Sequence, residues 1–230
     1  MCGKFTQMAS WAEVRAFSTP LDGGDVVQSN HRQGSNDREE TFTPMRDARV
    51  IRLTESGKRE LVSMRWGWPD RWTGMPVDRP RHMHAKSETV DVLRTFKDSF
   101  AMSRGILPVR TFNVGEEAGK KVIQHVLTPC DGKPLGIAVI WDTVPNRDGV
   151  LIEAFVMVTT EPNALIGTVT DRMPAILPPE QWGLWLGETH SPLSEVKALL
   201  VPYPGGLDMT LRPKAPTRPR GGPHAPGPML

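Results

Sequence analysis

The stretch RVIRLTESGKRELVSMRW, residues 49–66, is typical of a β-hairpin. Apolar and polar residues roughly alternate over 49–53 and again over 60–66, as they do in two half-buried antiparallel strands. Glu55-Ser56-Gly57-Lys58 supplies a turn between them. Further apolar segments bounded by turn sequences predict strands over 121–127, 135–141 and 150–159. The chain is therefore expected to be dominated by antiparallel sheet.

Helices are expected to be fewer and short. Ser10-Trp11-Ala12-Glu13 is a capping box that opens one of them. Apolar residues at helical spacing predict a helix over 88–100, and Pro and Gly signals predict helices over 179–187 and 191–200. Together with the strands, these segments predict an α+β fold, in which a mainly antiparallel sheet curls into a barrel with a few flanking helices.

The chain of 230 residues is long enough for one large domain. We expect a folded domain over residues 1–202 and a disordered, basic tail over 203–230, which is rich in Pro and Gly. Residues 21–47 are expected to form a long surface loop. No stretch approaches the roughly 20 apolar residues of a membrane span, so we expect no membrane partner.

The sequence contains two cysteines, Cys2 and Cys130, which is too few for a disulfide framework. The N-terminus also lacks the basic and then apolar layout of a signal peptide. A reducing environment is the natural one for such a chain. We therefore expect a cytoplasmic protein.

The net charge of +2 is unevenly distributed. The segment from Arg212 onward has four bases and no acid, which leaves 24 bases against 26 acids, or a charge near −2, in the rest of the chain. The folded part therefore has no global basic field, and this argues against a long duplex footprint. A local basic patch can still hold a compact single-stranded or junction DNA.

Cys2 directly follows the start methionine. If Met1 is removed, Cys2 carries an α-amine and a thiol two carbons apart, with reference pKa values of about 7.7–8.0 and 8.5. The amine can condense with an aldehyde to an imine, and the thiolate can then close a thiazolidine ring. Cys2 can equally be a plain thiol nucleophile whose own amine is the general base. The remaining alternative is a small residue without chemistry.

Five segments, in order, resemble the SOS response-associated peptidase (SRAP) family of abasic-site-processing proteins. They are Met1–Thr6, the block from Arg65 to Pro69 with Trp72, His84–Thr89, Lys133–Asp142 and Thr159–Leu177. The resemblance covers about residues 1–187. It implies that mature Cys2 forms a thiazolidine crosslink with an abasic site in single-stranded DNA, in the DNA repair of the SOS response at the bacterial nucleoid. It also implies a protease-like self-removal of the residue ahead of Cys2.

Three positions depart from the family pattern. His84 stands where the family has an Asn, Thr170 where it has a His before "D-R-M-P", and Val114 where it has a catalytic Glu. The carboxylates nearest to Val114 in the sequence are Glu116 and Glu117. Steps that need a general acid or base are therefore the ones most affected.

The predicted catalytic residues are Cys2, His84, Thr170 and Glu116. Histidine has a reference pKa of about 6.5, so His84 is the residue best suited to take over proton transfer. The alternative for His84 is a solvated loop histidine beside His82.

Contacts with DNA can be predicted from the same motifs. Lys86 stands where the family has a phosphate-contacting Arg, and we predict further DNA contacts from Arg172, Arg65 and Arg81. Trp68 is predicted to stack on an unpaired base, which is worth roughly 1–3 kcal/mol, whereas Trp66 is expected in the core. His82 and His84 alone do not make a metal site, and we expect no metal, no cofactor and a monomer.

Two other functions fit parts of the sequence. An N-terminal Cys-Gly also opens the glutamine amidotransferase domains of the N-terminal-nucleophile hydrolases, and Phe112-Asn113 faintly resembles their "F-N-G" loop. The loss of the family's Glu and His instead suggests a DNA-binding paralogue without catalytic activity.

Overall fold

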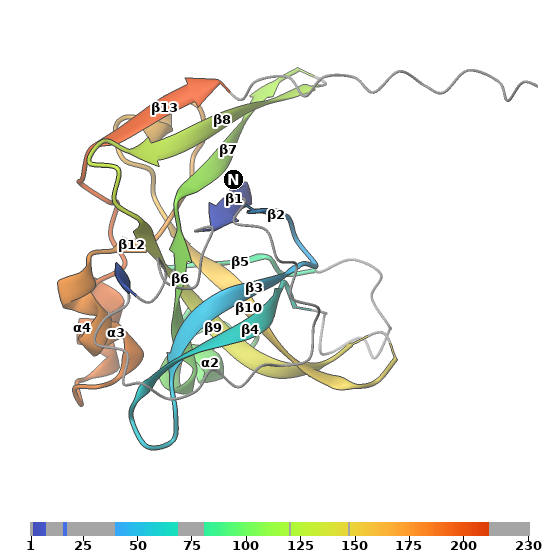
Figure 1. Cartoon of the computed structure of the whole chain (residues 1–230), viewed down its shortest axis with the longest axis vertical. Coiled ribbons are helices and arrows are strands. Elements are labelled where there is room, and N and C mark those ends of the chain that lie inside the picture. Colours follow the sequence, from blue (N-terminus) through green and yellow to red (C-terminus); the bar gives the residue numbers. More distant parts are fainter. Residues whose placement is uncertain are drawn as a thin grey trace, which may run out of the picture.

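The computed structural model describes residues 2–7, 16–17, 40–68, 81–119, 121–146 and 148–211. Within these ranges most of the regular structure is β-strand (Figure 1). The expected fold class, a mainly antiparallel sheet curled into a barrel with a few helices, is confirmed. No helix in these ranges is long and apolar enough to cross a lipid bilayer.

Five strands close into a ring. In order around it they are β3 (Asp47–Leu53), β4 (Arg59–Trp66), β10 (Leu151–Thr160), β9 (Leu135–Pro145) and β6 (Arg104–Val109). β4 and β10 are parallel, whereas the other neighbours in the ring are antiparallel. β3 and β4 form the predicted hairpin, and Gly57 in its turn has a φ of 76°, a value that favours glycine.

Three short strands extend this sheet beside β9 and β10. β5 (His84–Lys86) runs parallel to β10, β11 (Met173–Pro174) pairs with the end of β10, and β12 (Ile176–Leu177) pairs with β9. The segments that begin at His84 and end at Leu177 are far apart in the sequence, and β10 brings them together.

A second, fully antiparallel sheet carries the N-terminal end of the chain. In order, its strands are β13 (Leu207–Leu211), β8 (Lys121–Pro129), β7 (Thr111–Ala118), β1 (Cys2–Gln7) and β2 (Glu40–Phe42). In Figure 1, β7 and β8 form a long hairpin at the top of the molecule, and β1 lies beside β7.

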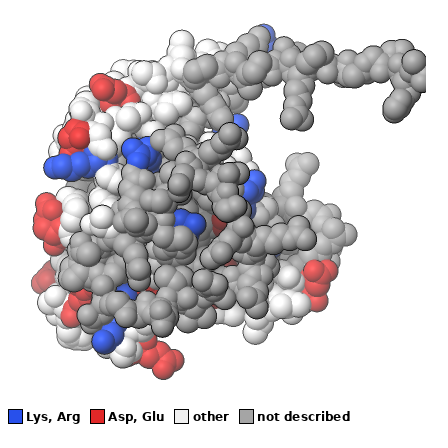
Figure 2. Space-filling model, viewed as in Figure 1, with Lys and Arg blue, Asp and Glu red and all other residues white. Residues whose placement is uncertain are grey.

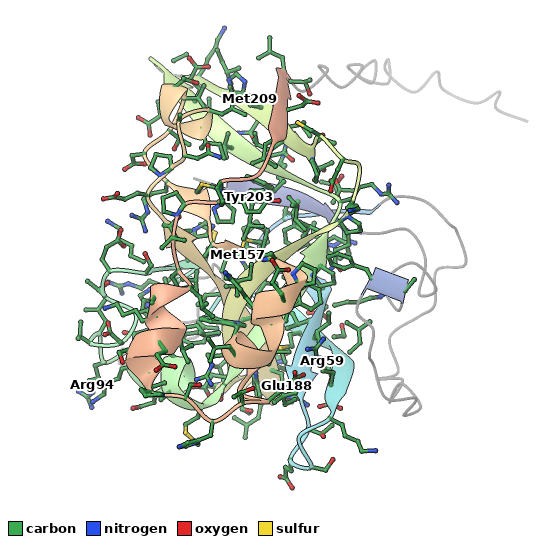
Figure 3. The ribbon with its side chains drawn as sticks, turned by 90° about the vertical axis from the view of Figure 1, so that its left-hand side faces the viewer. Arg59, Arg94, Met157, Glu188, Tyr203 and Met209 are labelled. Carbon is green, nitrogen blue, oxygen red and sulfur yellow. The ribbon has the colours of Figure 1, made fainter. Side chains whose placement is uncertain are left out.

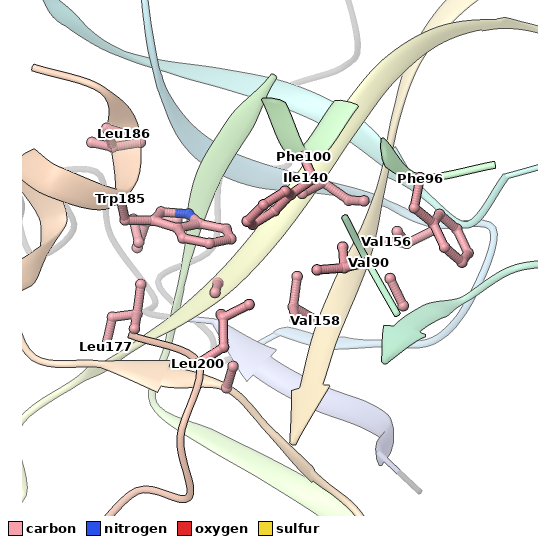
Figure 4. Packing of buried hydrophobic residues seen from close by; sticks show 14 of the residues in the cluster. Val90, Phe96, Phe100, Ile140, Val156, Val158, Leu177, Trp185, Leu186 and Leu200 are labelled. Carbon is pink, nitrogen blue, oxygen red and sulfur yellow. The ribbon is translucent and has the colours of Figure 1, made fainter. Parts of the chain in front are cut away.

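β6, β9 and β10 contain runs of consecutive buried residues, and since successive side chains point to opposite sides of a strand, these strands are buried on both faces there. In β10, Phe155 and Met157 belong to the core cluster that includes Phe5 and Phe112 of the second sheet. The intervening Val156 belongs to a second cluster with residues of the helices. Figure 4 shows part of this second cluster, in which residues of strands and helices meet, among them Phe100, Ile140, Val156 and Trp185.

The short helices are α2 (Lys97–Met102), α3 (Trp182–Leu186) and α4 (Leu193–Ala198), with 3-10 turns at Ile166–Thr168 and Pro179–Gln181. α3 ends at Gly187, whose φ is 95°, as the sequence predicts. Its Trp182 packs on Gly136 of β9, where a Cβ atom would lie 2.5 Å from the ring. Arg59 and Glu188 point toward one another in Figure 3 and form an ion pair between β4 and the segment after α3.

The helix expected over 88–100 is corrected to a series of turns followed by α2. The backbone N–H of Ser87 donates to the carbonyl of Thr159, which ties the start of the segment to β10. Val92 and Leu93 are 66% and 47% exposed, so the apolar residues do not form one buried helical stripe.

Two boundaries are also corrected. The tail was expected to begin at residue 203, but Leu207–Leu211 is β13, which pairs with β8 and buries Leu207. The loop expected over 21–47 includes β2 at Glu40–Phe42 and the start of β3. The capping box at 10–13 and residues 212–230 lie outside the described residues.

Candidate functional site

β1 fixes the backbone of Cys2 at the start of a strand that is paired on both sides. Cys2 lies opposite Val114 of β7, and a β-bulge follows before Lys4 meets Asn113. On the other side, β1 pairs with β2. A chain terminus is ordinarily poorly ordered unless it is tied down, so this pairing gives Cys2 a defined place.

Two buried side chains anchor β1. The Phe5 ring stacks on Phe42 with a centroid distance of 5.3 Å and packs against Trp66 at 5.1 Å. The Gln7 amide donates to the carbonyl of Arg49 at 2.8 Å and accepts from the N–H of Arg49 at 3.0 Å. These contacts fix the strand within five residues of Cys2.

His84 begins β5 and pairs with Met157 of β10. Its ring lies edge-on to Trp66 at 6.1 Å, and Trp66 in turn contacts Phe5 of β1. Trp66 is fully buried, as expected, and its Nε1 donates to the carbonyl of Met83 at 3.1 Å. The Trp66 indole ring therefore lies between His84 and Phe5 of β1. His84 itself is half-buried.

Val114 is fully buried and directly opposite Cys2, at the position that the family glutamate occupies in the resemblance. Its apolar side chain cannot transfer a proton. On its other side, Val114 pairs with His125 of β8. The His125 Nε2 atom lies 2.7 Å from Oε2 of Glu116, so the predicted Glu116 is part of a His–Glu pair.

Sequence reasoning missed His125. It is an isolated histidine in a predicted strand, with no motif around it. Only the register of β7 against β8 brings it next to Glu116 and Val114. One signal was available in the sequence: in a strand over 121–127, alternate residues share a face, so His125 lies on the same face as the apolar Leu127. A histidine on an apolar strand face is a candidate for a specific role.

Thr170 lies in the segment between the 3-10 turn at Ile166–Thr168 and β11, and its N–H donates to the carbonyl of Ile166. It is half-buried. Because β11 and β5 both pair with the end of β10, Thr170 and His84 belong to two segments that flank the same strand end. The third segment, β1, meets this group through Trp66 and Phe5.

Arg172 is a structural residue here and not an open phosphate contact. It is 8% exposed, and its two Nη atoms donate to the Glu88 carboxylate at 2.5 and 2.9 Å. Nη2 also donates to the carbonyl of Thr159 at 2.6 Å. Hydrogen bonds from Arg172 hold the pKa of Glu88 below its usual value of 4.5. The pair clamps the segment after β5 to the segment before β11.

The predicted stacking role of Trp68 is also corrected. The indole is fully buried, packs on Phe96, and donates from Nε1 to the carbonyl of Ala154 at 2.9 Å. No face of the ring is open to a base. Arg65 is partly exposed but forms a two-pronged ion pair with Asp47, at 2.9 and 3.4 Å.

Lys86 and Arg81 are the two predicted DNA contacts that are exposed. Lys86 ends β5, two residues after His84, and Arg81 precedes the bridge between Trp68 and His82. On the face seen in Figure 2, acidic side chains lie mainly along the outline, whereas several basic side chains lie further in.

Cys130 is exposed and lies at the end of β8. Partial desolvation and the neighbouring Asp208 raise the pKa of its thiol, which lowers the fraction of reactive thiolate. Among the described residues, no three His, Cys, Asp or Glu side chains form a group that could hold a metal ion.

Comparisons with known proteins agree on one family. A family model described as SOS response associated peptidase (SRAP) matches residues 1–214. The chain is 26% identical over 199 residues to the abasic site processing protein YedK of Escherichia coli, which covers 83% of this chain and 82% of that protein. It is 23% identical over 204 residues to the abasic site processing protein YoaM of Bacillus subtilis, which covers 88% and 86%.

Solved structures show the same fold. A protein of Bacteroides thetaiotaomicron aligns with a TM-score of 0.75 and 22% identity, over 95% of this chain and 97% of that one. A protein of Bordetella bronchiseptica aligns with a TM-score of 0.69 and 24% identity, over 93% and 100%. At these identities the likeness concerns the fold alone.

Proposed function

Because this chain belongs to the SOS response-associated peptidase (SRAP) family of abasic site processing proteins, we propose that it captures abasic sites in single-stranded DNA through a covalent bond to Cys2. The E. coli and B. subtilis relatives are named for abasic site processing. The names do not specify the bond or the residue, and both come from the chemistry of Cys2.

The reaction proceeds in two steps once Met1 has been removed. The α-amine of Cys2 adds to the ring-opened aldehyde of the abasic sugar, and loss of one water leaves an imine. The Cys2 thiol then adds across the C=N bond, so that sulfur bonds to carbon and the thiol proton ends on nitrogen. The product is a thiazolidine that links the protein to DNA, with no oxidant or cofactor consumed.

The observation that carries the proposal is the fixed place of Cys2 in the second sheet. Its backbone is paired with β7, and Phe5 and Gln7 anchor the strand within five residues. An amine and a thiol that react in sequence with one aldehyde benefit from such an orientation, since a positioned group need not be brought in from solution. A cysteine on a frayed terminus does not have this advantage.

Binding of DNA is assigned to Lys86 and Arg81. Both are exposed, and Lys86 lies two residues from His84, next to the strand end where the three segments meet. Lysine and arginine contacts to phosphates supply sequence-independent affinity. A small number of such contacts fits a short single-stranded footprint.

The glutamine amidotransferase alternative is less well supported. The family match over residues 1–214 gives it no place, and Phe112-Asn113 lies within strand β7, whereas the resemblance to those enzymes needs a loop. The alternative of a DNA-binding paralogue without catalysis rests on the apolar Val114 opposite Cys2. It predicts DNA binding with no covalent product.

The test is to incubate the full-length protein with a single-stranded oligonucleotide that contains one abasic site, and to look for a heat-stable shifted band on a denaturing gel. We expect the band with the wild type and with Cys130→Ala, and we expect none with Cys2→Ala. DNA binding without a covalent band in the wild type would favour the non-catalytic paralogue. A band of undiminished intensity with Cys2→Ala would contradict the proposal.

A further inference from the structure

The geometry points to Glu116, held by His125, as the group that transfers protons at the α-amine of Cys2 during imine formation. This inference rests on the proposed function and specifies how the reaction proceeds without the glutamate that relatives are expected to have at position 114. Glu116 is the catalytic residue in this proposal, and His125 is a positioning residue that acts through it.

The strand register brings Glu116 to the amino end of β1. β1 and β7 are antiparallel, and from Lys4 to Cys2 along β1 the partner changes from Asn113 to Val114 along β7. The amino end of β1 therefore points toward the part of β7 that contains Glu116. Diagonal neighbours on adjacent antiparallel strands have Cα atoms about 7–8 Å apart, which is within reach of a Glu side chain.

The face of the strand is the right one. Side chains two residues apart share a face, so Glu116 lies on the same face of β7 as Val114, the residue opposite Cys2. Glu117, the adjacent carboxylate, lies on the other face and is exposed. Of the two carboxylates that the sequence offers next to Val114, only Glu116 shares the strand face of Val114.

His125 fixes one end of the Glu116 carboxylate. Its Nε2 atom lies 2.7 Å from Oε2 of Glu116, and its side chain is 11% exposed. The Glu116 side chain is 39% exposed. One carboxylate oxygen is therefore held by a buried ring, while part of the group stays accessible to solvent and to a substrate. A freely rotating surface carboxylate would lack this orientation.

The proton balance of imine formation needs one such group and no more. When the amine nitrogen bonds to the aldehyde carbon, the carbonyl electron pair moves to oxygen, and Glu116 transfers one proton from nitrogen to that oxygen to give the carbinolamine. Glu116 then takes up a proton from solvent and delivers it to the hydroxyl, which leaves as water while the C=N bond forms, and the remaining nitrogen proton is returned to solvent. The carboxylate ends as it began. General acid–base groups contribute typically 10²–10⁴-fold.

The experiment follows imine formation by itself. Full-length protein whose mass lacks Met1 is mixed in excess with abasic single-stranded DNA, and sodium cyanoborohydride traps the imine at each time point. We expect Glu116→Gln to slow trapping by about 10²-fold at saturating protein. Gln keeps a side chain that can hydrogen-bond His125, and added acetate is expected to restore part of the rate, which a purely structural defect would not permit.

Two controls complete the test. Glu117→Gln removes the same charge from the adjacent, oppositely facing position and is expected to leave the rate unchanged. His125→Gln is expected to slow trapping by itself and to add nothing to Glu116→Gln, because residues that act as one unit are not additive. Equal slowing by the two Glu variants, additive losses at positions 116 and 125, or a wild-type rate in Glu116→Gln would overturn the inference.

The outcome also separates this inference from the proposed function. If the wild type forms a Cys2-dependent crosslink and Glu116→Gln forms it at the same rate, only the role of Glu116 is wrong. If the wild type traps no imine at all, the proposed function itself is wrong, and the inference falls with it.

Discussion

Cys2 and Val114 lie directly opposite one another on β1 and β7. The residue that faces the proposed nucleophile across the sheet is thus a fully buried valine. Glu116 follows two residues further along β7 and pairs with His125 of β8. The scaffold around Cys2 is that of the family, while the groups that would move protons are arranged differently.

Release of the crosslink is expected to be slow in this protein. Reversal needs a proton delivered to the departing thiolate, and the Thr170 hydroxyl does not titrate near neutral pH. We expect Thr170→His to speed exchange of the crosslink onto competing abasic DNA, by up to the roughly 10²-fold that such a group supplies. Exchange is followed on denaturing gels after excess competitor is added. His84→Ala is expected to slow the residual exchange of the wild type, and fast exchange that is equal in all three proteins would contradict both roles.

Lys86 is expected to contribute to the affinity for single-stranded DNA and not to the free energy of unfolding. Because it is exposed at the end of β5, Lys86→Ala should weaken binding to single-stranded DNA uniformly across sequences. The slope of log K against log salt should fall by about 0.7, the value for one phosphate contact on a single strand. Lys58→Ala is the matched control, because Lys58 is an exposed lysine in the turn between β3 and β4, and this turn lies far from β1 in Figure 1. An equal effect of the two substitutions would show that Lys86 acts only through net charge.

The Glu88–Arg172 ion pair is expected to stabilise the fold in a pH-dependent way. Arg172 lowers the pKa of Glu88 below 4.5, so the contribution is fully present above that pH and is lost as the pH falls through the folded-state pKa. Glu88→Gln should lower the free energy of unfolding at pH 7 by about 1 kcal/mol, a modest value because the Glu88 side chain is 45% exposed. The difference from the wild type should shrink in urea titrations at more acidic pH. A difference that is constant over pH would contradict the assignment.

Removal of residues 212–230 is expected to affect DNA binding, whereas removal of β13 as well is expected to affect the stability of the fold. A protein that ends at Leu211 retains β13, and it should keep its melting temperature and its crosslinking. It loses four bases, so at low salt its DNA affinity should be lower than that of the wild type. The difference between the two proteins should disappear as the salt concentration rises, because the Debye length falls to about 10 Å at 0.1 M and the charges of the tail are then screened.

A protein that ends at Pro202 loses the β13–β8 pairing and the buried Leu207. Full burial of a Leu side chain is worth about 2 kcal/mol, so this truncation should lower the free energy of unfolding by at least that amount. Equal melting temperatures for the two truncated proteins would show that β13 adds nothing to the fold.

The strands that the sequence predicts are those whose apolar residues carry the pattern without interruption. β3, β4, β8, β9 and β10 are of this kind, and the structure extends them by a few residues. β7 was not predicted, because Asn113, Gly115 and Glu116 interrupt its apolar pattern. β13 was hidden between Gly205-Gly206 and the prolines that follow Leu211. Each of these two strands is defined by its partner more than by its own residues.

The candidate site residues that could be predicted from the sequence are those that lie in recognisable motifs. Motifs predicted Cys2, His84 and Thr170 as candidates, and the short sequence distance from Val114 predicted Glu116. His125 could not be found, because its role depends on the register between two strands. For Arg172 and Trp68 the motif predicted a DNA contact that the structure does not support. A motif identifies a residue, but it does not show whether the polar atoms of that residue are already hydrogen-bonded inside the protein.

The most direct test of the central claim is to locate the covalent bond. The protein is allowed to react with abasic single-stranded DNA, the product is digested with nuclease and trypsin, and the modified peptide is identified by mass spectrometry. The account predicts the sugar remnant on the peptide Cys2-Gly3-Lys4, with Met1 absent and the thiol no longer open to alkylation. A remnant on a lysine such as Lys86, or on a peptide that still carries Met1, would contradict it.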